Sequence, residues 1–309
     1  MDYQPNILAS TLASKKTYRF ATFFPEPASD VSYWNKPLTG VKRAFQEIQQ
    51  YGVEISNFQF KQSEASSFKK TASEIMRNPP DGVVMTPFFS RESKEFIQLL
   101  NENKIPFVFI DSNIKGCERI SYIGQNSYQS GALAAKLFNF SVPGEASILV
   151  IHFAKEMDNQ NHLVQREKGF YEYFKENDPT KQKSLITLEI TNPGDKSFHK
   201  QVVEVFDKNP NIKGIFVTNS QVYRMGQYLE EKKIQDIRLI GHDLIKENMA
   251  FVKKGTVDFL ICQRPEEQGY NAVTTLFQHT ILKKEVANEQ FTSIDIVTKE
   301  NVEYYKEFN

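Results

Sequence analysis

The sequence predicts an α/β protein made of two doubly wound lobes, each with a parallel sheet covered by helices. Short apolar runs alternate regularly with segments that have the 3.6-residue periodicity of amphipathic helices. Such alternation predicts βαβ units. About ten apolar runs are many for one sheet of this kind, and 309 residues suffice for two lobes of ordinary size.

The predicted strands are short apolar runs that end at polar or glycine residues. They are residues 20–24, 53–60, 82–86, 107–110, 121–123, 148–152, 185–190, 214–218, 237–241 and 257–262. The helical pattern lies between them and is clearest in residues 41–48, 170–174, 202–206 and 270–281.

The composition is that of a soluble globular chain, with 40% apolar and 25% charged residues. No apolar run is long enough to span a membrane, and the first residues lack the layout of a secretory signal. A formal net charge of zero gives no overall basic surface for nucleic acid. Cys117 and Cys262 lack metal-ligand spacing, and we expect both to be reduced thiols in a cytoplasmic protein.

Polar residues follow two neighbouring predicted strands in residues 237–270. One strand ends before Asp243 and the next before Gln263, and Pro265 then suits the first turn of a helix. In open parallel sheets, ligands bind outside the carboxyl ends of the strands. We therefore expect Asp243 and Gln263 to bind ligand; the alternative is that Asp243 caps the following helix and Gln263 is a plain loop residue.

This stretch resembles the effector domains of LacI-family transcription regulators and the related periplasmic sugar-binding proteins. The matching pattern is a strand followed by Gly-x-Asp, then a strand followed by Gln-x-Pro-x-x-x-Gly. It is formed here by Gly241, Asp243, Gln263, Pro265 and Gly269. The resemblance implies the periplasmic binding protein type I fold, in which three crossovers join two lobes.

The resemblance also implies the lobe boundaries, which composition alone does not reveal. The expected parts are a hinge segment at residues 1–17, an N-terminal lobe at 18–124 plus 264–292, and a C-terminal lobe at 125–263 plus 293–309.

The first residues resemble the hinge of the LacI family, in which this segment becomes helical on operator DNA. The matching residues are Tyr3, Asn6, Ala9 and Leu12. A leucine at the position of Leu12 wedges into the minor groove in that family, which kinks the duplex. The resemblance implies that a helix-turn-helix headpiece, absent from this chain, belongs in front of the hinge. The alternative is a frayed terminus.

Aromatic residues follow two predicted strands of the first lobe. Tyr33 and Trp34 match two aromatics that flank the sugar in the sugar-binding relatives, and Phe88 is a candidate pocket wall. Alternatively, Tyr33 and Trp34 pack beneath the helix that they begin, and Phe88 lies in a surface loop. Glu26 and Asp30, in the same long loop as Tyr33, are further candidate ligands.

Three polar residues complete the predicted ligand set. Asp111 matches an aspartate of many relatives, Arg166 lies in an Arg-x-x-Gly-Phe pattern whose arginine reaches the ligand, and Asn219 matches a ligand-binding asparagine. The alternatives are an interlobe turn for Asp111 and a solvated helix face for Arg166.

Two positions depart from the family, and one segment leaves the choice open. Ser112 stands where some sugar binders have an arginine. This difference weakens the expectation that the chain binds the same sugars as those proteins. Ser220 replaces the usual aspartate, and we expect it only to cap a helix at residues 221–232. One further wall residue is expected from Asn192, Asp195 or Phe198.

No enzyme motif accompanies these residues. The nucleotide-binding glycine patterns, the nucleophile elbow and the H-E-x-x-H zinc motif are all missing. The five histidines are scattered and are interpreted as ordinary loop, surface or core residues. We therefore expect neither catalysis, nor a cofactor, nor a metal.

The sequence favours a ligand-sensing and dimerisation domain of a LacI-type regulator. By resemblance, it binds a monosaccharide or sugar acid in the interlobe cleft, forms a homodimer and controls contact with operator DNA, without a membrane partner. The alternative is a periplasmic-type sugar-binding protein that serves a transporter or receptor.

Overall fold

The computed structural model describes residues 16–27, 32–153, 161–178, 183–191 and 196–305. The chain forms two compact units. The first contains the residues up to Gly124 together with Arg264–Thr292, and the second contains Gln125–Gln263 and the residues from Ser293 onward. The chain therefore passes from one unit to the other three times.

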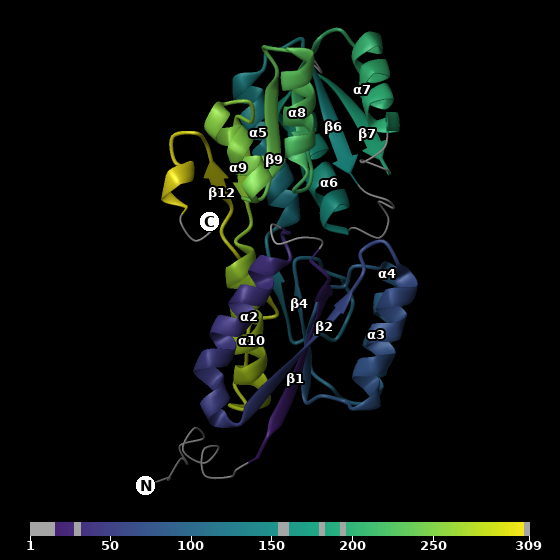
Figure 1. Cartoon of the computed structure of the whole chain (residues 1–309), viewed down its shortest axis with the longest axis vertical. Coiled ribbons are helices and arrows are strands. Elements are labelled where there is room, and N and C mark those ends of the chain that lie inside the picture. The colour runs from purple at the N-terminus through teal and green to yellow at the C-terminus, as the bar shows by residue number, and fades with distance from the viewer. Residues whose placement is uncertain (1–15, 28–31, 154–160, 179–182, 192–195, 306–309) are drawn as a thin grey trace. The chain divides into compact units, whose positions relative to one another are not determined.

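The first unit is a sheet with helices on both faces. Its strands are β1 (Tyr18–Pro25), β2 (Val53–Phe60), β3 (Gly82–Met85), β4 (Phe107–Ile110), β5 (Ser121–Gly124) and β11 (Glu289–Phe291). Its helices are α2 (Asn35–Ile48), α3 (Ala65–Arg77), α4 (Ser90–Glu102) and α10 (Pro265–Thr280), with a short 3-10 helix at Gln49–Tyr51. Figure 1 shows α2 beside α10 on one side of this sheet, and α3 with α4 on the other.

Strand β1 shows why this sheet is covered on both faces. Successive side chains of a strand point to opposite faces. Phe20 and Phe24 accordingly pack into the core beneath α2 and α10, whereas Phe23 packs into the core beneath α3 and α4. A strand buried on both sides reads as a continuous apolar run, which is the pattern found at residues 20–24.

The second unit repeats this architecture. Its strands are β6 (Ser147–Phe153), β7 (Ser184–Ile190), β8 (Ile212–Val217), β9 (Arg238–His242), β10 (Phe259–Cys262) and β12 (Asp295–Val297). Its helices are α5 (Ser127–Ser141), α6 (Asn161–Asn177), α7 (Lys196–Lys208), α8 (Val222–Lys232) and α9 (Lys246–Lys254), with a 3-10 helix at Val302–Tyr304.

Both sheets have the same doubly wound strand order. The first sheet runs β11-β5-β4-β3-β1-β2 and the second β12-β10-β9-β8-β6-β7. The direction of winding reverses between β1 and β3 and again between β6 and β8. In such sheets the crevice at the carboxyl ends of the two strands flanking the reversal is the usual place for a ligand.

The predicted α/β class with two sheet-based lobes is confirmed, with one difference in detail. The edge strand β12 pairs with β10 in antiparallel fashion. The chain reaches β12 from the first unit without an intervening helix, so the crossover connection that a parallel neighbour requires is missing. Neither β11 nor β12 was predicted, because each has three residues and no apolar run.

The start of α10 agrees with the sequence pattern. Pro265 occupies the first turn of the helix, where Glu266 and Glu267 face its positive end. Gly269 serves close packing of α10 on α2: a Cβ atom at this position would lie 2.1 Å from the backbone oxygen of Pro37. The glycine that ends the Gln-x-Pro-x-x-x-Gly pattern therefore lets two helix backbones touch.

Candidate ligand-binding site

At the carboxyl edge of the first sheet, Tyr33 and Asp111 lie together. Asp111 follows β4 directly, is 5% exposed and has a left-handed backbone with φ of 64°. The Tyr33 hydroxyl donates to Asp111 Oδ1 at 2.9 Å, and the Asp111 N–H donates to Gln268 Oε1 at 3.0 Å. The hydroxyl of Tyr122 donates to the Asp111 backbone oxygen at 3.1 Å. These contacts fix the Asp111 carboxylate at the end of β4.

Of the three predicted aromatic wall residues of this edge, Trp34 is buried, whereas Tyr33 and Phe88 are half-buried. Trp34 is 5% exposed, belongs to the core beneath α2, and stacks on Phe24 with ring centroids 6.5 Å apart. Tyr33 stands perpendicular to it at 5.1 Å. Phe88 is half-buried and packs against Phe60 at 5.9 Å. Trp34 thus has the core packing that was the alternative to a ligand contact.

At the carboxyl edge of the second sheet, Arg166, Gln263 and Asp243 form one hydrogen-bonded chain. Arg166 is 1% exposed and donates from Nη2 to Gln263 Oε1 at 3.1 Å. Gln263 donates from Nε2 to Asp243 Oδ1 at 2.8 Å. Arg166 also donates from Nη1 to the backbone oxygen of Thr218 at 2.7 Å. The ends of β8, β9 and β10 therefore meet around one guanidinium group.

Arg166 retains hydrogen-bonding capacity in this arrangement. Its Nε atom is buried and has no hydrogen-bond partner among the described residues. A buried guanidinium donor without an acceptor is costly unless a ligand or water supplies one. The predicted alternative, a solvated helix face, is wrong for Arg166, since the side chain points into the unit.

Asn219 lies at the point where the winding of the second sheet reverses. Its amide nitrogen donates to the backbone oxygen of Phe153 at 2.7 Å, and its Oδ1 accepts from the Gln221 N–H at 3.2 Å. Asn219 therefore ties the end of β8 to the end of β6. Its ligand contact stays a prediction.

The structure shows neither the expected capping role of Ser220 nor the alternative capping role of Asp243. Helix α8 has Gln221 at its N-cap and no side-chain capping bond, so Ser220 does not cap it. The N-cap of α9 is Ile245, again without a side-chain bond, so Asp243 is not a cap either. Both loops are held instead by the buried amide of Asn248, which donates to the backbone oxygens of Ser220 and Asp243 at 2.9 Å each.

Several predicted residues take no part in these groups. Phe198 is 5% exposed and packs against Phe153 in the core of the second unit. Glu26 is exposed. The remaining candidates, Asp30, Asn192 and Asp195, and the hinge residues Tyr3, Asn6, Ala9 and Leu12 lie outside the described residues.

Two buried histidines lie near Arg166 and were not singled out by the sequence. His242 is fully buried, with Nε2 at 2.9 Å from Ser130 Oγ. Burial, and then the nearby Arg166 charge, hold the pKa of His242 well below its usual 6.5. His152 is also fully buried and neighbours Glu167, whose pKa lies below the usual 4.5 chiefly because of the His152 side chain. Scattered single histidines carry no sequence signal for such contacts.

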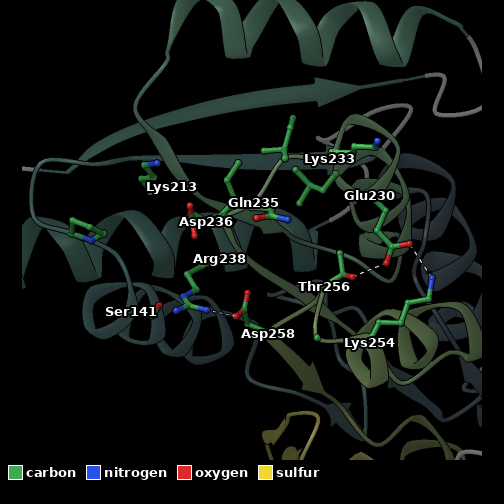
Figure 2. Close-up of a pocket in the computed structure, with 15 residues that line it drawn as sticks. Ser141, Lys213, Glu230, Lys233, Gln235, Asp236, Arg238, Lys254, Thr256 and Asp258 are labelled. Atoms are coloured by element: carbon green, nitrogen blue, oxygen red, sulfur yellow. Dashed lines mark hydrogen bonds and ion pairs between the residues drawn. The ribbon is translucent and has the colours of Figure 1, made fainter.

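A separate hollow lies at the other edge of the second sheet. Figure 2 shows this pocket of about 800 Å³, lined by residues at the amino-terminal ends of β8 and β9, such as Lys213 and Arg238. Arg238 pairs with Asp258 at 2.8 Å, and Lys254 with Glu230 at 2.9 Å. None of the eight predicted ligand-binding residues lines it. Its lining thus carries charges of both signs, which include these two ion pairs.

The described residues contain no cluster of metal-ligating side chains, and no described helix is both long and apolar enough to cross a membrane. Cys262 is buried within β10, as expected, and both Cys262 and Cys117 are free thiols.

Comparison with known proteins gives matches in both sequence and fold. The family described as periplasmic binding protein domain matches residues 20–285. A solved protein from Bacteroides fragilis, provisionally assigned as a LacI transcriptional regulator, is 33% identical, with a TM-score of 0.85 over 94% of this chain and 100% of that one. No curated protein matches the chain.

Two more distant structures share the fold. GanP, a glucose-galactose binding protein from Geobacillus stearothermophilus, is 21% identical, with a TM-score of 0.81 over 93% of this chain and 99% of its own. A transporter solute-binding protein from Agrobacterium vitis, bound with α-D-tagatopyranose, is 18% identical, with a TM-score of 0.80 over 93% of this chain and 96% of its own. These three solved proteins are described as a regulator and two binding proteins.

Proposed function

Because the chain belongs to the periplasmic binding protein domain family, we propose that it is the ligand-sensing and dimerisation domain of a LacI-type transcription regulator. Its effector is a small sugar or a sugar derivative. The 33% identity to the Bacteroides fragilis protein over nearly the whole chain supports the regulator assignment.

The polar groups at the carboxyl edges of the two sheets support a polyhydroxylated ligand. Asp111 and Asp243 supply carboxylate acceptors, and Arg166 supplies a buried guanidinium donor. Hydroxyl groups both donate and accept, so a sugar matches such a mixture. The buried Nε atom of Arg166, a donor without an acceptor among the described residues, is the single observation that most favours a ligand at the carboxyl edge of the second sheet.

A sugar regulates in this scheme by shifting an equilibrium between open and closed forms. The shift is limited by the difference in its affinity for the two forms. In a homodimer, the change reaches the hinge residues Tyr3, Asn6, Ala9 and Leu12, which contact operator DNA in the cytoplasm. The proposed domain performs no catalysis and needs neither a cofactor nor a metal.

The test is a titration with monosaccharides and sugar acids, one at a time, beginning with D-arabinose, D-tagatose and D-allose, sugars held by solved relatives. Intrinsic fluorescence of Trp34, the single tryptophan, and the melting temperature are followed together. A saturable rise in melting temperature with one sugar is expected. If no monosaccharide or sugar acid raises it, the proposed ligand class is wrong. Turnover of a bound sugar would contradict the non-enzymatic assignment.

The second candidate function is a sugar-binding protein that serves a transporter. The match to the periplasmic binding protein domain family and the fold shared with transporter proteins favour it. Sedimentation of the chain with and without the bound sugar separates the two functions. A stable homodimer supports the proposed dimerisation domain of a regulator, whereas sugar binding by a monomer supports the transport role.

A further inference from the structure

Arg166 and Glu167 are neighbours on α6, and both are connected to Thr218, Arg166 directly and Glu167 through His152. Arg166 Nη1 donates to the Thr218 backbone oxygen at 2.7 Å. Glu167 Oε1 lies 3.4 Å from His152 Nε2, and the other ring nitrogen of that histidine lies 2.8 Å from the Thr218 hydroxyl oxygen. A closed path of contacts thus connects a partly exposed carboxylate, a buried histidine and the predicted ligand-binding arginine.

The Glu167 carboxylate lies beside one ring nitrogen of His152, and the Thr218 hydroxyl lies beside the other. An ionised carboxylate accepts hydrogen bonds and cannot donate them, so its proximity favours the tautomer with hydrogen on Nε2. His152 Nδ1 then accepts from the Thr218 hydroxyl at 2.8 Å, in competition with the Ile151 backbone oxygen, which lies 3.3 Å from the same hydroxyl. At 3.4 Å the contact with Glu167 is electrostatic, and Nε2 has no hydrogen-bond partner among the described residues.

Further hydrogen bonds fix the positions of Thr218 and Glu167, the two residues that flank His152. The Thr218 N–H donates to the Ile151 backbone oxygen at 3.1 Å, which ties the end of β8 to β6. Glu167 Oε1 also accepts from the Thr187 hydroxyl at 3.1 Å, which fixes the carboxylate against β7. Three neighbouring strands therefore contribute to the orientation of one guanidinium group.

We infer that His152 and Glu167 are positioning residues for sugar binding, which act by holding Thr218 so that its carbonyl group orients Arg166. The ligand part of this inference rests on the proposed function. Burying both an imidazole and a guanidinium costs free energy that apolar residues of similar volume would not. Positioning of Arg166 would explain why these costly groups are buried, because a ligand-binding group is most effective when its neighbours fix its geometry.

The first experiment needs no sugar. Nitrogen NMR of the whole chain at pH 8 reports the tautomer of His152, and the Nε–H signal of Arg166, assigned by its loss in Arg166→Lys, reports the guanidinium environment. The expected wild-type tautomer carries hydrogen on Nε2. Glu167→Gln is expected to shift the His152 nitrogen signals and the Arg166 signal. Glu176→Gln, which removes another, exposed carboxylate of α6, is the matched control.

Rescue by a conservative variant separates positioning from simple packing. His152→Asn keeps an acceptor near the position of Nδ1, whereas His152→Leu removes it. We expect the Arg166 signal to stay close to its wild-type position in His152→Asn and to move in His152→Leu. In the His152→Asn background, Glu167→Gln should have no further effect on Arg166. A hydrogen on Nδ1, or an Arg166 signal unchanged in both Glu167→Gln and His152→Leu, would overturn the inference.

The second experiment measures affinity for the sugar found by titration. Glu167→Gln is expected to weaken binding about two- to fivefold, the size of one partly exposed charge contact, with Glu176→Gln unchanged. If the NMR signals behave as expected but no sugar binds, the proposed function fails and the positioning contacts stand. If sugar binds and Glu167→Gln leaves both its affinity and the Arg166 signal unchanged, the positioning inference fails alone.

Discussion

A Cβ atom on Gly131 would lie 1.8 Å from the backbone oxygen of Arg166. The relationship is reciprocal, because a Cβ atom on Gly169 would lie 2.0 Å from the backbone oxygen of Tyr128. Helices α5 and α6 therefore cross with their backbones in contact. The position of Arg166 relative to the sheet depends on these two glycines, which explains the glycine of the Arg-x-x-Gly-Phe pattern.

Gly169→Ala is expected to lower the free energy of unfolding by about 2 kcal/mol, since the added methyl group must separate two helix backbones. This loss exceeds the roughly 1 kcal/mol that alanine gains over glycine in a helix. Urea unfolding measures the change. Lys136→Ala, at an exposed position of α5, is the control and should change stability little. A more stable Gly169→Ala variant would contradict the packing described.

Arg166→Lys is expected to weaken sugar binding at least about tenfold while the protein still folds. Lysine keeps the charge but cannot donate in a planar fork to both Thr218 and Gln263, so one acceptor loses its partner. A loss of stability of about 1–3 kcal/mol should accompany the change. Calorimetric titration and urea unfolding measure the two effects.

The control for this variant is Lys168→Ala, which removes a half-exposed charge from the same helix. Its affinity and stability should stay near those of the unmodified protein. Equal affinities for Arg166→Lys and the unmodified protein would show that Arg166 does not hold the ligand.

Asp111→Ala is expected to destabilise the first unit more than Asp111→Asn. The backbone φ of 64° is better tolerated by Asn or Asp than by alanine, and Asn also keeps an acceptor for the Tyr33 hydroxyl. A difference of about 1–2 kcal/mol in the free energy of unfolding is expected. Equal stabilities in urea would mean that neither the backbone conformation nor the Tyr33 contact matters.

Stability is expected to fall as the pH drops below 6.5, in part because of His242. Its pKa in the folded protein is depressed well below 6.5, so between these values the unfolded chain binds a proton that the folded chain does not. The contribution of His242 is fully present above pH 6.5 and is lost below it at about 1.4 kcal/mol per pH unit.

Urea unfolding at several pH values from 8 to 5 tests this dependence. His242→Gln should flatten the slope below pH 6.5, whereas His199→Gln, at a half-exposed histidine, should leave it unchanged. The same slope in the His242→Gln variant would assign the pH dependence to other groups.

The predictable part of the site was the list of residues at strand ends. Asp243 and Gln263 follow buried strands in the sequence, and they are hydrogen-bonded in the structure. Their contact follows because neighbouring parallel strands end at one edge. Trp34 shows the limit of this reasoning: position after a strand does not say whether a ring faces a ligand or the core, and here it packs on Phe24.

By itself, the sequence determined the α/β class and the main strands and helices, because apolar periodicity is a local property of the chain. It also indicated that Pro265 suits the first turn of a helix. The tertiary structure alone decided the partners of buried polar groups. His152 is hydrogen-bonded to Thr218, which lies 66 residues away in the sequence, and Gln263 is hydrogen-bonded to Arg166, which lies 97 residues away. Such pairs arise from the order of strands in the sheet, which no local pattern encodes.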